Sequence, residues 1–203
     1  MKAVITGDII GSTKSSPENW LPVLKEALKT WGKEPAAWEL YRGDSFQLRV
    51  SNPMQAIEAA VYIKAAIKTV SGLDVRVGIG LGEIAYTAKK ITESNGTAFI
   101  HSGEVFEQLS KMNQEMAIKS PWHQFDMEMN LMLKLALIPM NQWTVSAAIA
   151  VWEVLKKPDL TQKELGAKLG ITQHAVSARL SRAHMEVIQE WMAYYPVKLK
   201  TYL

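Results

Sequence analysis

The sequence predicts an α/β (α+β) N-terminal domain followed by an all-α C-terminal domain. Strand-like and helix-like patterns alternate over the first 120 residues, which is typical of a layered fold. After about residue 140 the apolar residues recur only at helical spacing, and two short capped helices are indicated near residue 165. We therefore expect an α/β domain at 1–120, a connecting helix at 121–140 and a helix-turn-helix domain at 141–203.

The N-terminal elements are expected in the order β-α-β-β-α-β. Strand assignments rest on alternation of apolar and polar residues, and helix assignments on apolar residues three or four positions apart. A turn at Gly43-Asp44 joins two half-buried strands, which places Asp44 at the tip of a hairpin. The remaining elements are a strand at 3–6 ending at Gly7-Asp8, a helix at 21–31, a helix at 53–70, a strand at 75–81, a helix at 96–112 and a weak strand at 116–119.

Composition excludes several classes of function. The chain has 203 residues and no cysteine, which excludes disulfides, thiolate metal sites and cysteine nucleophiles and favours a reducing compartment. The apolar run at the N-terminus is too short for a signal peptide, and no later apolar run could span a bilayer. We therefore expect a cytoplasmic protein with no membrane partner.

The C-terminal part carries the signals of two helices joined by a tight turn. Thr161 and Glu164 form a capping-box pattern, Gly170 stands where a left-handed residue ends the first helix, and Thr172 can cap the second. Apolar residues at helical spacing continue to Trp191, which predicts one extended second helix. The methionine-rich segment 127–140 is expected to be a helix of core residues that ends at Pro139.

The second helix of this pair presents polar side chains that could enter the major groove of DNA. Short polar side chains at its start can reach base edges, and long cationic ones can bind phosphates. The candidate base-reading residues are Thr172, Gln173, His174, Ser177 and Ser181, and the candidate phosphate-binding residues are Lys168, Arg179 and Arg182. A packing or dimerisation module that binds no DNA is the alternative interpretation.

Two aspartates in the N-terminal part suggest a metal or nucleotide site. Asp8 follows a strand and precedes the small residues Gly11 and Ser12, whose backbone amides could face an anion. Asp44 lies on the hairpin turn. Two carboxylates from adjacent strands supply oxygen ligands of the kind that Mg²⁺ prefers, with nucleotide phosphates completing the coordination. Each aspartate alone is also an ordinary turn residue.

Three segments together resemble, in order and spacing, the catalytic domain of class III nucleotidyl cyclases. They are Gly7-Asp8-Ile9-Ile10-Gly11-Ser12-Thr13, Arg42-Gly43-Asp44-Ser45-Phe46 and the glycine-rich segment 75–83. With a helix-turn-helix added, the chain resembles the SatD family of small bacterial proteins. The resemblance implies a ferredoxin-like, palm-like fold, Asp8 and Asp44 as Mg²⁺ ligands, and a nucleotide site that includes residues Ile9, Ile10, Gly11, Ser12, Thr13, Arg42 and Glu93.

The sequence departs from the cyclase pattern at three positions. Ile100 and Glu104 stand where the cyclases carry the transition-state asparagine and arginine, and Leu40 replaces a base-recognising lysine. A glutamate in place of the arginine inverts the charge that would stabilise phosphoryl transfer. Arg42 or Arg76 could substitute, although Arg42 is equally expected on the surface and Arg76 beside an acidic neighbour. The departures favour binding without turnover.

The favoured interpretation is a DNA-binding transcriptional regulator whose cyclase-like domain senses a ligand or dimerises. A homodimer is expected, with DNA and a nucleotide as partners. The alternative is a metal-dependent nucleotidyl cyclase or nucleotidyltransferase-like enzyme with an accessory helix-turn-helix. In a third interpretation both parts are scaffolding.

Overall fold

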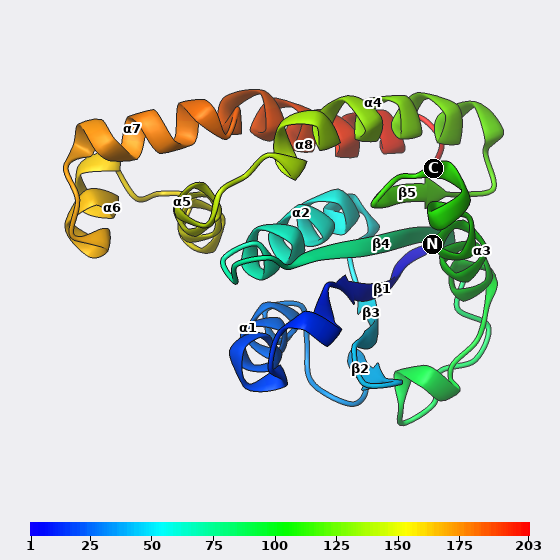
Figure 1. Ribbon diagram of the computed structural model, residues 1–203. Coiled ribbons are helices and arrows are strands. Elements are labelled where there is room, and N and C mark those ends of the chain that lie inside the picture. The colour runs from blue at the N-terminus through cyan, green and yellow to red at the C-terminus, as the bar shows by residue number, and fades with distance from the viewer.

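The computed structural model describes all 203 residues and has an α+β fold, as the sequence predicts. It contains eight helices and one mixed five-stranded sheet (Figure 1). The strands are β1 (Lys2–Ile10), β2 (Trp38–Tyr41), β3 (Ser45–Val50), β4 (Asp74–Gly82) and β5 (Met116–Lys119). The helices are α1 (Pro17–Lys29), α2 (Ala56–Ile67), α3 (Thr97–Met112), α4 (His123–Asn141), α5 (Val145–Lys156), α6 (Gln162–Leu169), α7 (Gln173–Arg182) and α8 (Met185–Lys200).

The strands lie in the order β2-β3-β1-β4-β5, and only the β4–β5 pair is parallel. The central strand β1 is longer than predicted, because it continues through Gly7 and Asp8 to Ile10. Its neighbours β3 and β4 supply hydrogen-bonding partners on both sides, and this pairing overrides the local turn preference of a Gly-Asp pair. Asp8 therefore lies within a strand, directly opposite Arg76 on β4 and Ser45 on β3.

The two faces of the sheet are covered in different ways. Val75, Val77 and Ile79 of β4 belong to the main apolar core, which also contains residues of α1 and α2. The alternate residues Gly78 and Gly80 face α3, and a Cβ atom at Gly80 would lie 2.1 Å from the Ala98 carbonyl oxygen. The glycines of β4 therefore allow α3 to approach the sheet backbone closely.

Two helices differ from expectation. Helix α4 continues through Pro139 to Asn141, because a proline so near the end removes only one hydrogen bond of the last turn. Its methionines are not all core residues: Met129 is buried, whereas Met127 is 56% exposed. The predicted extended second helix is wrong as well, since α7 ends at Arg182 and the left-handed His184 (φ 53°) separates it from α8.

One apolar core joins the sheet to the C-terminal helices. Phe125 of α4 and Tyr195 of α8 belong to the same cluster as the sheet residues, and the Tyr195 hydroxyl donates a hydrogen bond to the Pro53 carbonyl. Figure 1 shows α4 and α8 along the top of the molecule, with α6 and α7 at one end, beyond α5 and away from the sheet. None of the helices combines the length and apolar character needed to cross a membrane.

Candidate functional sites

A cleft of about 520 Å³ lies where β1, the β2–β3 hairpin, the start of β4 and the end of α3 meet. It brings together six of the nine residues predicted for a metal or nucleotide site. These are Asp8, Ile9, Ile10, Gly11, Ser12 and Asp44. The cross-strand register explains this, because Asp8 of β1 lies opposite Ser45, the residue that follows Asp44.

Asp8 forms a bidentate ion pair with Arg76 across the β1–β4 pair. Arg76 Nε donates to Asp8 Oδ1 at 2.9 Å, and Nη2 donates to Oδ2 at 2.5 Å. The third guanidinium nitrogen, Nη1, donates to Ser110 Oγ on α3 at 2.7 Å. The hydrogen bonds to Asp8 raise the pKa of Arg76, so the guanidinium is fixed in the charged state. The prediction that Arg76 has an acidic neighbour is therefore confirmed.

Asp44 is held by the segment that follows β1. Ser12 donates a hydrogen bond to Asp44 Oδ2 at 2.5 Å, and the Ile9 amide donates to the Asp44 carbonyl at 3.3 Å. The chain turns at Gly11, where φ is +83° and a Cβ atom would lie 2.9 Å from the Gly72 carbonyl oxygen. A residue other than glycine would be strained there, so Gly11 sets the position of Ser12 against Asp44.

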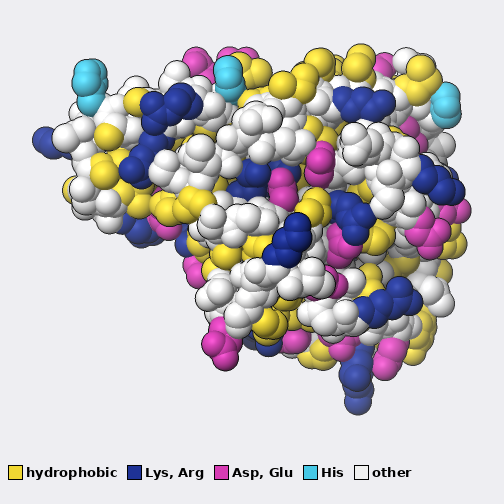
Figure 2. Space-filling view, viewed as in Figure 1, with side chains coloured by type: hydrophobic (Ala, Val, Ile, Leu, Met, Phe, Trp, Pro, Cys, Tyr) yellow, Lys and Arg dark blue, Asp and Glu magenta, His cyan; other side chains and the backbone are white.

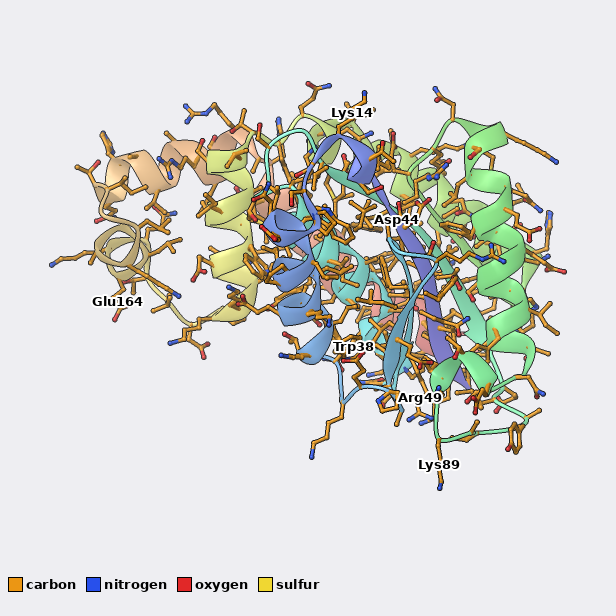
Figure 3. All side chains as sticks on the ribbon, turned by 60° about the horizontal axis from the view of Figure 1, so that its bottom comes forward. Lys14, Trp38, Asp44, Arg49, Lys89 and Glu164 are labelled. Atoms are coloured by element: carbon orange, nitrogen blue, oxygen red, sulfur yellow. The ribbon has the colours of Figure 1, made fainter.

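Three predicted site residues do not line the cleft. Thr13 and Arg42 are exposed beside it. Glu93 is also exposed and lies in a short turn whose residue Thr92 donates a hydrogen bond to Glu39 of β2. Figure 3 shows Asp44 at one end of the hairpin, and Trp38 and Arg49 at the other. Because Glu39 adjoins Trp38, Glu93 belongs to the end of the hairpin remote from Asp44.

The structure adds cleft residues that sequence reasoning missed. Ser110, Asn113, Gln114 and Glu115 come from the end of α3 and the connection to β5. Gln114 is buried: its amide nitrogen donates to the Met116 carbonyl, but its Oε1 atom has no hydrogen-bond partner. A buried acceptor without a donor is unfavourable, so Gln114 is an unsatisfied polar group behind the wall of the cleft.

The carboxylates fit Mg²⁺ by type but not in this arrangement. Both oxygens of Asp8 are bound to Arg76, and one oxygen of Asp44 accepts from Ser12. No group of three or more acidic or histidine side chains is placed to hold a metal ion. A divalent cation would have to compete with the Arg76 guanidinium for Asp8, which is a cost of direct charge repulsion.

A buried charged network lies next to the cleft. Lys64 of α2 is fully buried, and its Nζ lies 2.6 Å from Asp74 Oδ1 at the start of β4. Burial lowers the pKa of Lys64, while Asp74 opposes this shift. Lys68 also binds Asp74 and donates to the Asn141 carbonyl, and the Asn141 amide donates to Glu115 in the cleft. The end of α4 is thereby connected to the cleft by hydrogen bonds.

Helices α6 and α7 are two short helices joined by a tight turn. The capping box predicted at Thr161 and Glu164 is present, Gly170 is left-handed with φ 65°, and the Thr172 hydroxyl accepts from the Ala175 amide. A Cβ atom at Gly166 would lie 2.7 Å from the Ile171 carbonyl oxygen, so the turn packs directly on α6. Leu165 and Val176 are buried.

The start of α7 is open to solvent. Of the candidate base-reading residues, Thr172, Gln173, His174 and Ser181 are exposed and Ser177 is partly exposed. Arg182 is exposed, Arg179 is partly exposed, and neither forms an ion pair. Lys168 differs, because its ammonium is paired with the half-buried carboxylate of Glu153 on α5.

Positive charge is concentrated around these helices. Residues 157–184 carry five lysines and arginines against two acidic residues, whereas the rest of the chain carries eighteen of each. The formal net charge of +3 therefore resides entirely in this segment. Figure 2 shows basic side chains over the end of the molecule formed by α6 and α7. Comparison with protein-family models, curated proteins and solved structures gave no match to this chain.

Proposed function

We propose that the protein is a cytoplasmic DNA-binding transcriptional regulator in which α6 and α7 form a helix-turn-helix. The observation that carries the proposal is the exposed polar start of α7, beginning at Thr172, which no other part of the chain covers. In this motif the second helix enters the major groove and its first residues meet base edges. Gln173 and His174 provide the donors and acceptors needed there.

The charge distribution supports the same proposal. A segment of net charge +3 on an otherwise neutral chain attracts the DNA backbone at the point where α7 is presented. Arg179 and Arg182 form no ion pair within the chain, so neither charge is neutralised by an acidic side chain. Lys168 would have to leave Glu153 first, which makes it the weakest of the three candidate phosphate contacts.

The N-terminal domain is proposed to be a nucleotide sensor. The strand order β4-β1-β3-β2, with α1 and α2 in one layer, supports the ferredoxin-like, palm-like architecture implied by the resemblance to cyclases and to the SatD family. In the cleft, Arg76 and Ser12 provide the donors that suit phosphate oxygens. Magnesium is proposed to bind only together with a nucleotide, since phosphates give Arg76 another anion to pair with.

A metal-dependent nucleotidyl cyclase is the second candidate, and the convergence of Asp8 and Asp44 on one cleft favours it. The positions expected to stabilise a transition state argue against turnover. Ile100 is 56% exposed, and Glu104 forms an ion pair with Lys119 at 2.6 Å. The residues around the cleft therefore support binding of a nucleotide better than its conversion.

DNA binding is tested by genomic binding followed by mobility-shift titrations of the recovered sequence. We expect Gln173→Ala to change the sequence preference and Arg179→Ala to weaken binding to all sequences alike. Lys89→Ala, a lysine at the far end of the molecule from α7, serves as the matched charge control (Figure 3). Equal binding by wild type and both α7 variants, or no binding by wild type, refutes the helix-turn-helix function.

Enzymatic activity is tested by incubating the protein with each nucleoside triphosphate and Mg²⁺ or Mn²⁺. We expect nucleotide binding without product formation. Turnover that is abolished by Asp8→Ala and by Asp44→Ala would establish the second candidate instead. Because the readout is product, this experiment is independent of the DNA titration.

A further inference from the structure

Helix α4 is apolar on both sides. Its inner side contributes Phe125, Met129, Leu133, Leu137 and Met140 to the core. Its outer side carries a second apolar row, Met127, Leu131, Leu135 and Ile138, whose members are 56–66% exposed. A surface helix normally pairs one apolar face with one polar face, and a helix that is apolar all round is normally buried. No other element of the chain covers the outer row of α4, which is therefore an unpartnered apolar surface.

The flank of α8 extends this apolar surface. Val187 and Val197 are 62% and 61% exposed, and Tyr194 is 41% exposed. Between α4 and α8 lies an apolar groove of about 700 Å³. Leu135 and Ile138 line one wall, and Val187, Trp191 and Tyr194 line the other. Figure 2 shows hydrophobic side chains gathered along the upper edge, where Figure 1 places α4.

The size of this surface matches what a stable dimer buries. The four α4 residues and the three α8 residues each expose roughly 100 Å² of apolar area, or roughly 700 Å² together. A standard interface buries about 800 Å² on each partner. Exposed apolar patches of several hundred Å² mark interaction sites in most proteins.

We propose that this surface binds a second copy of the chain through a two-fold axis. A two-fold interface needs a surface that is complementary to itself, and this one carries both an apolar ridge on α4 and an apolar groove beside it. The surface also carries both signs of charge, because Lys134 is exposed on α4 and the groove is lined by Glu190 as well as Arg182.

The interface deepens the proposed DNA function, on which this step rests. Arg182 and His184, which end α7 and precede α8, line the same groove. Pairing along α4 and α8 would therefore fix the separation of the two copies of α7. Dimeric helix-turn-helix proteins read half-sites whose centres lie about 34 Å apart, or a multiple of this, on one side of the duplex. The proposed partner thus determines a palindromic DNA site.

The interface is tested by measuring the molar mass of the full chain in solution. Light scattering coupled to gel filtration gives this mass, at several protein concentrations in the micromolar range. We expect wild type at twice the 22.7 kDa of one chain. Leu135→Glu and Val187→Glu should each give the monomer mass, with an unchanged far-ultraviolet circular dichroism spectrum. Ile100→Glu is the matched control, because Ile100 is equally exposed but lies on α3, and this variant should stay dimeric.

A monomeric wild type would overturn the proposed interface. The groove would then be a site for a small apolar ligand or for a different protein. Dimers that persist in both glutamate variants would also overturn it. DNA titration separates the two proposals. A wild-type dimer that binds no DNA leaves the interface standing and removes the proposed function. Leu135→Glu that binds a half-site like wild type but has lost at least tenfold affinity for the palindrome supports both.

Discussion

Arg76 on β4 covers both carboxylate oxygens of Asp8 on β1, so the aspartate expected to hold a metal is already paired with a cation. The pairing is fixed by register, because the two residues are directly opposed across the central strands. Ser110 and Asp8 together use all three guanidinium nitrogens. Arg76 is the one cation among the residues that line the cleft, where Asp8, Asp44 and Glu115 are the carboxylates, so it sets how negative the cleft is.

Arg76→Ala should increase the affinity of the cleft for divalent cations by about tenfold. This is the same change in free energy as a shift of about one pKa unit. The reason is that Asp8 and Asp44 are then left without the neutralising guanidinium. Titration of Mn²⁺, followed by its electron paramagnetic resonance signal, measures the change. Arg49→Ala, at the remote end of the hairpin, should behave like wild type (Figure 3). An unchanged Mn²⁺ affinity in Arg76→Ala would show that the two aspartates do not form a cation site.

Gly80→Ala should destabilise the protein by about 1–3 kcal/mol or more, because its Cβ atom would collide with the backbone of α3. Gly103→Ala is the control on α3 itself. No atom lies within 4 Å of its added Cβ, so this variant should be neutral or gain up to about 1 kcal/mol in helix propensity. Urea unfolding followed by circular dichroism gives both values. Equal stabilities of the two variants would contradict the close approach of α3 to β4.

Local signals were sufficient for most of the elements. The hairpin at Asp44, the strand at 116–119 and the capped helices at Thr161 and Thr172 are all present where residue patterns predict them. These features depend on interactions between residues close in the chain. The position of Asp44 was predicted for the same reason, because it lies in the hairpin turn, whereas Asp8 lies within β1 and meets Asp44 through the pairing of β1 with β3.

Non-local contacts account for what was missed. Sheet pairing carries β1 beyond Gly7, and α3 brings Ser110 and Gln114 into the cleft from a hundred residues away. The left-handed His184 divides a continuous helical pattern, and apolar periodicity alone does not reveal such a break. The exposure of the outer row of α4 was not predicted either. An apolar residue is assigned to the core from its type alone, whether or not another element covers it in the fold.

Asp74→Asn should destabilise the protein by about 3–5 kcal/mol at neutral pH, because it leaves the buried ammonium of Lys64 without its charged partner. Burial places the folded-state pKa of Lys64 below its unfolded value, so the unfolded chain binds more protons between the two values and stability rises with pH across that window. Loss of Asp74 lowers the folded pKa further, so the variant should gain stability more steeply than wild type as the pH rises toward the unfolded lysine value of about 10.4.

Urea titrations across this pH range test that prediction. The double variant Lys64→Met, Asp74→Asn should recover most of the lost stability and show no steep pH dependence, since the buried charge is gone. A single variant with the same pH slope as wild type would show that Lys64 reaches solvent when Asp74 is removed.

Lys168→Ala should weaken DNA binding less than Arg179→Ala, even though both residues are candidate phosphate contacts. The Lys168 ammonium is bound to Glu153, so its transfer to a phosphate gains little net charge interaction, whereas Arg179 has no ion pair to give up. Each full phosphate contact contributes about 0.9 to the slope of log affinity against log salt concentration. Mobility-shift titrations at several salt concentrations should therefore show a slope reduced by about 1 for Arg179→Ala and by much less for Lys168→Ala.

The Glu153→Gln variant provides a second test. It releases Lys168 from its ion pair, so the slope of log affinity against log salt concentration should be steeper than that of wild type. Identical slopes for wild type and Glu153→Gln would mean that Lys168 faces no phosphate in the complex, and that the DNA approaches α7 from the side opposite α5.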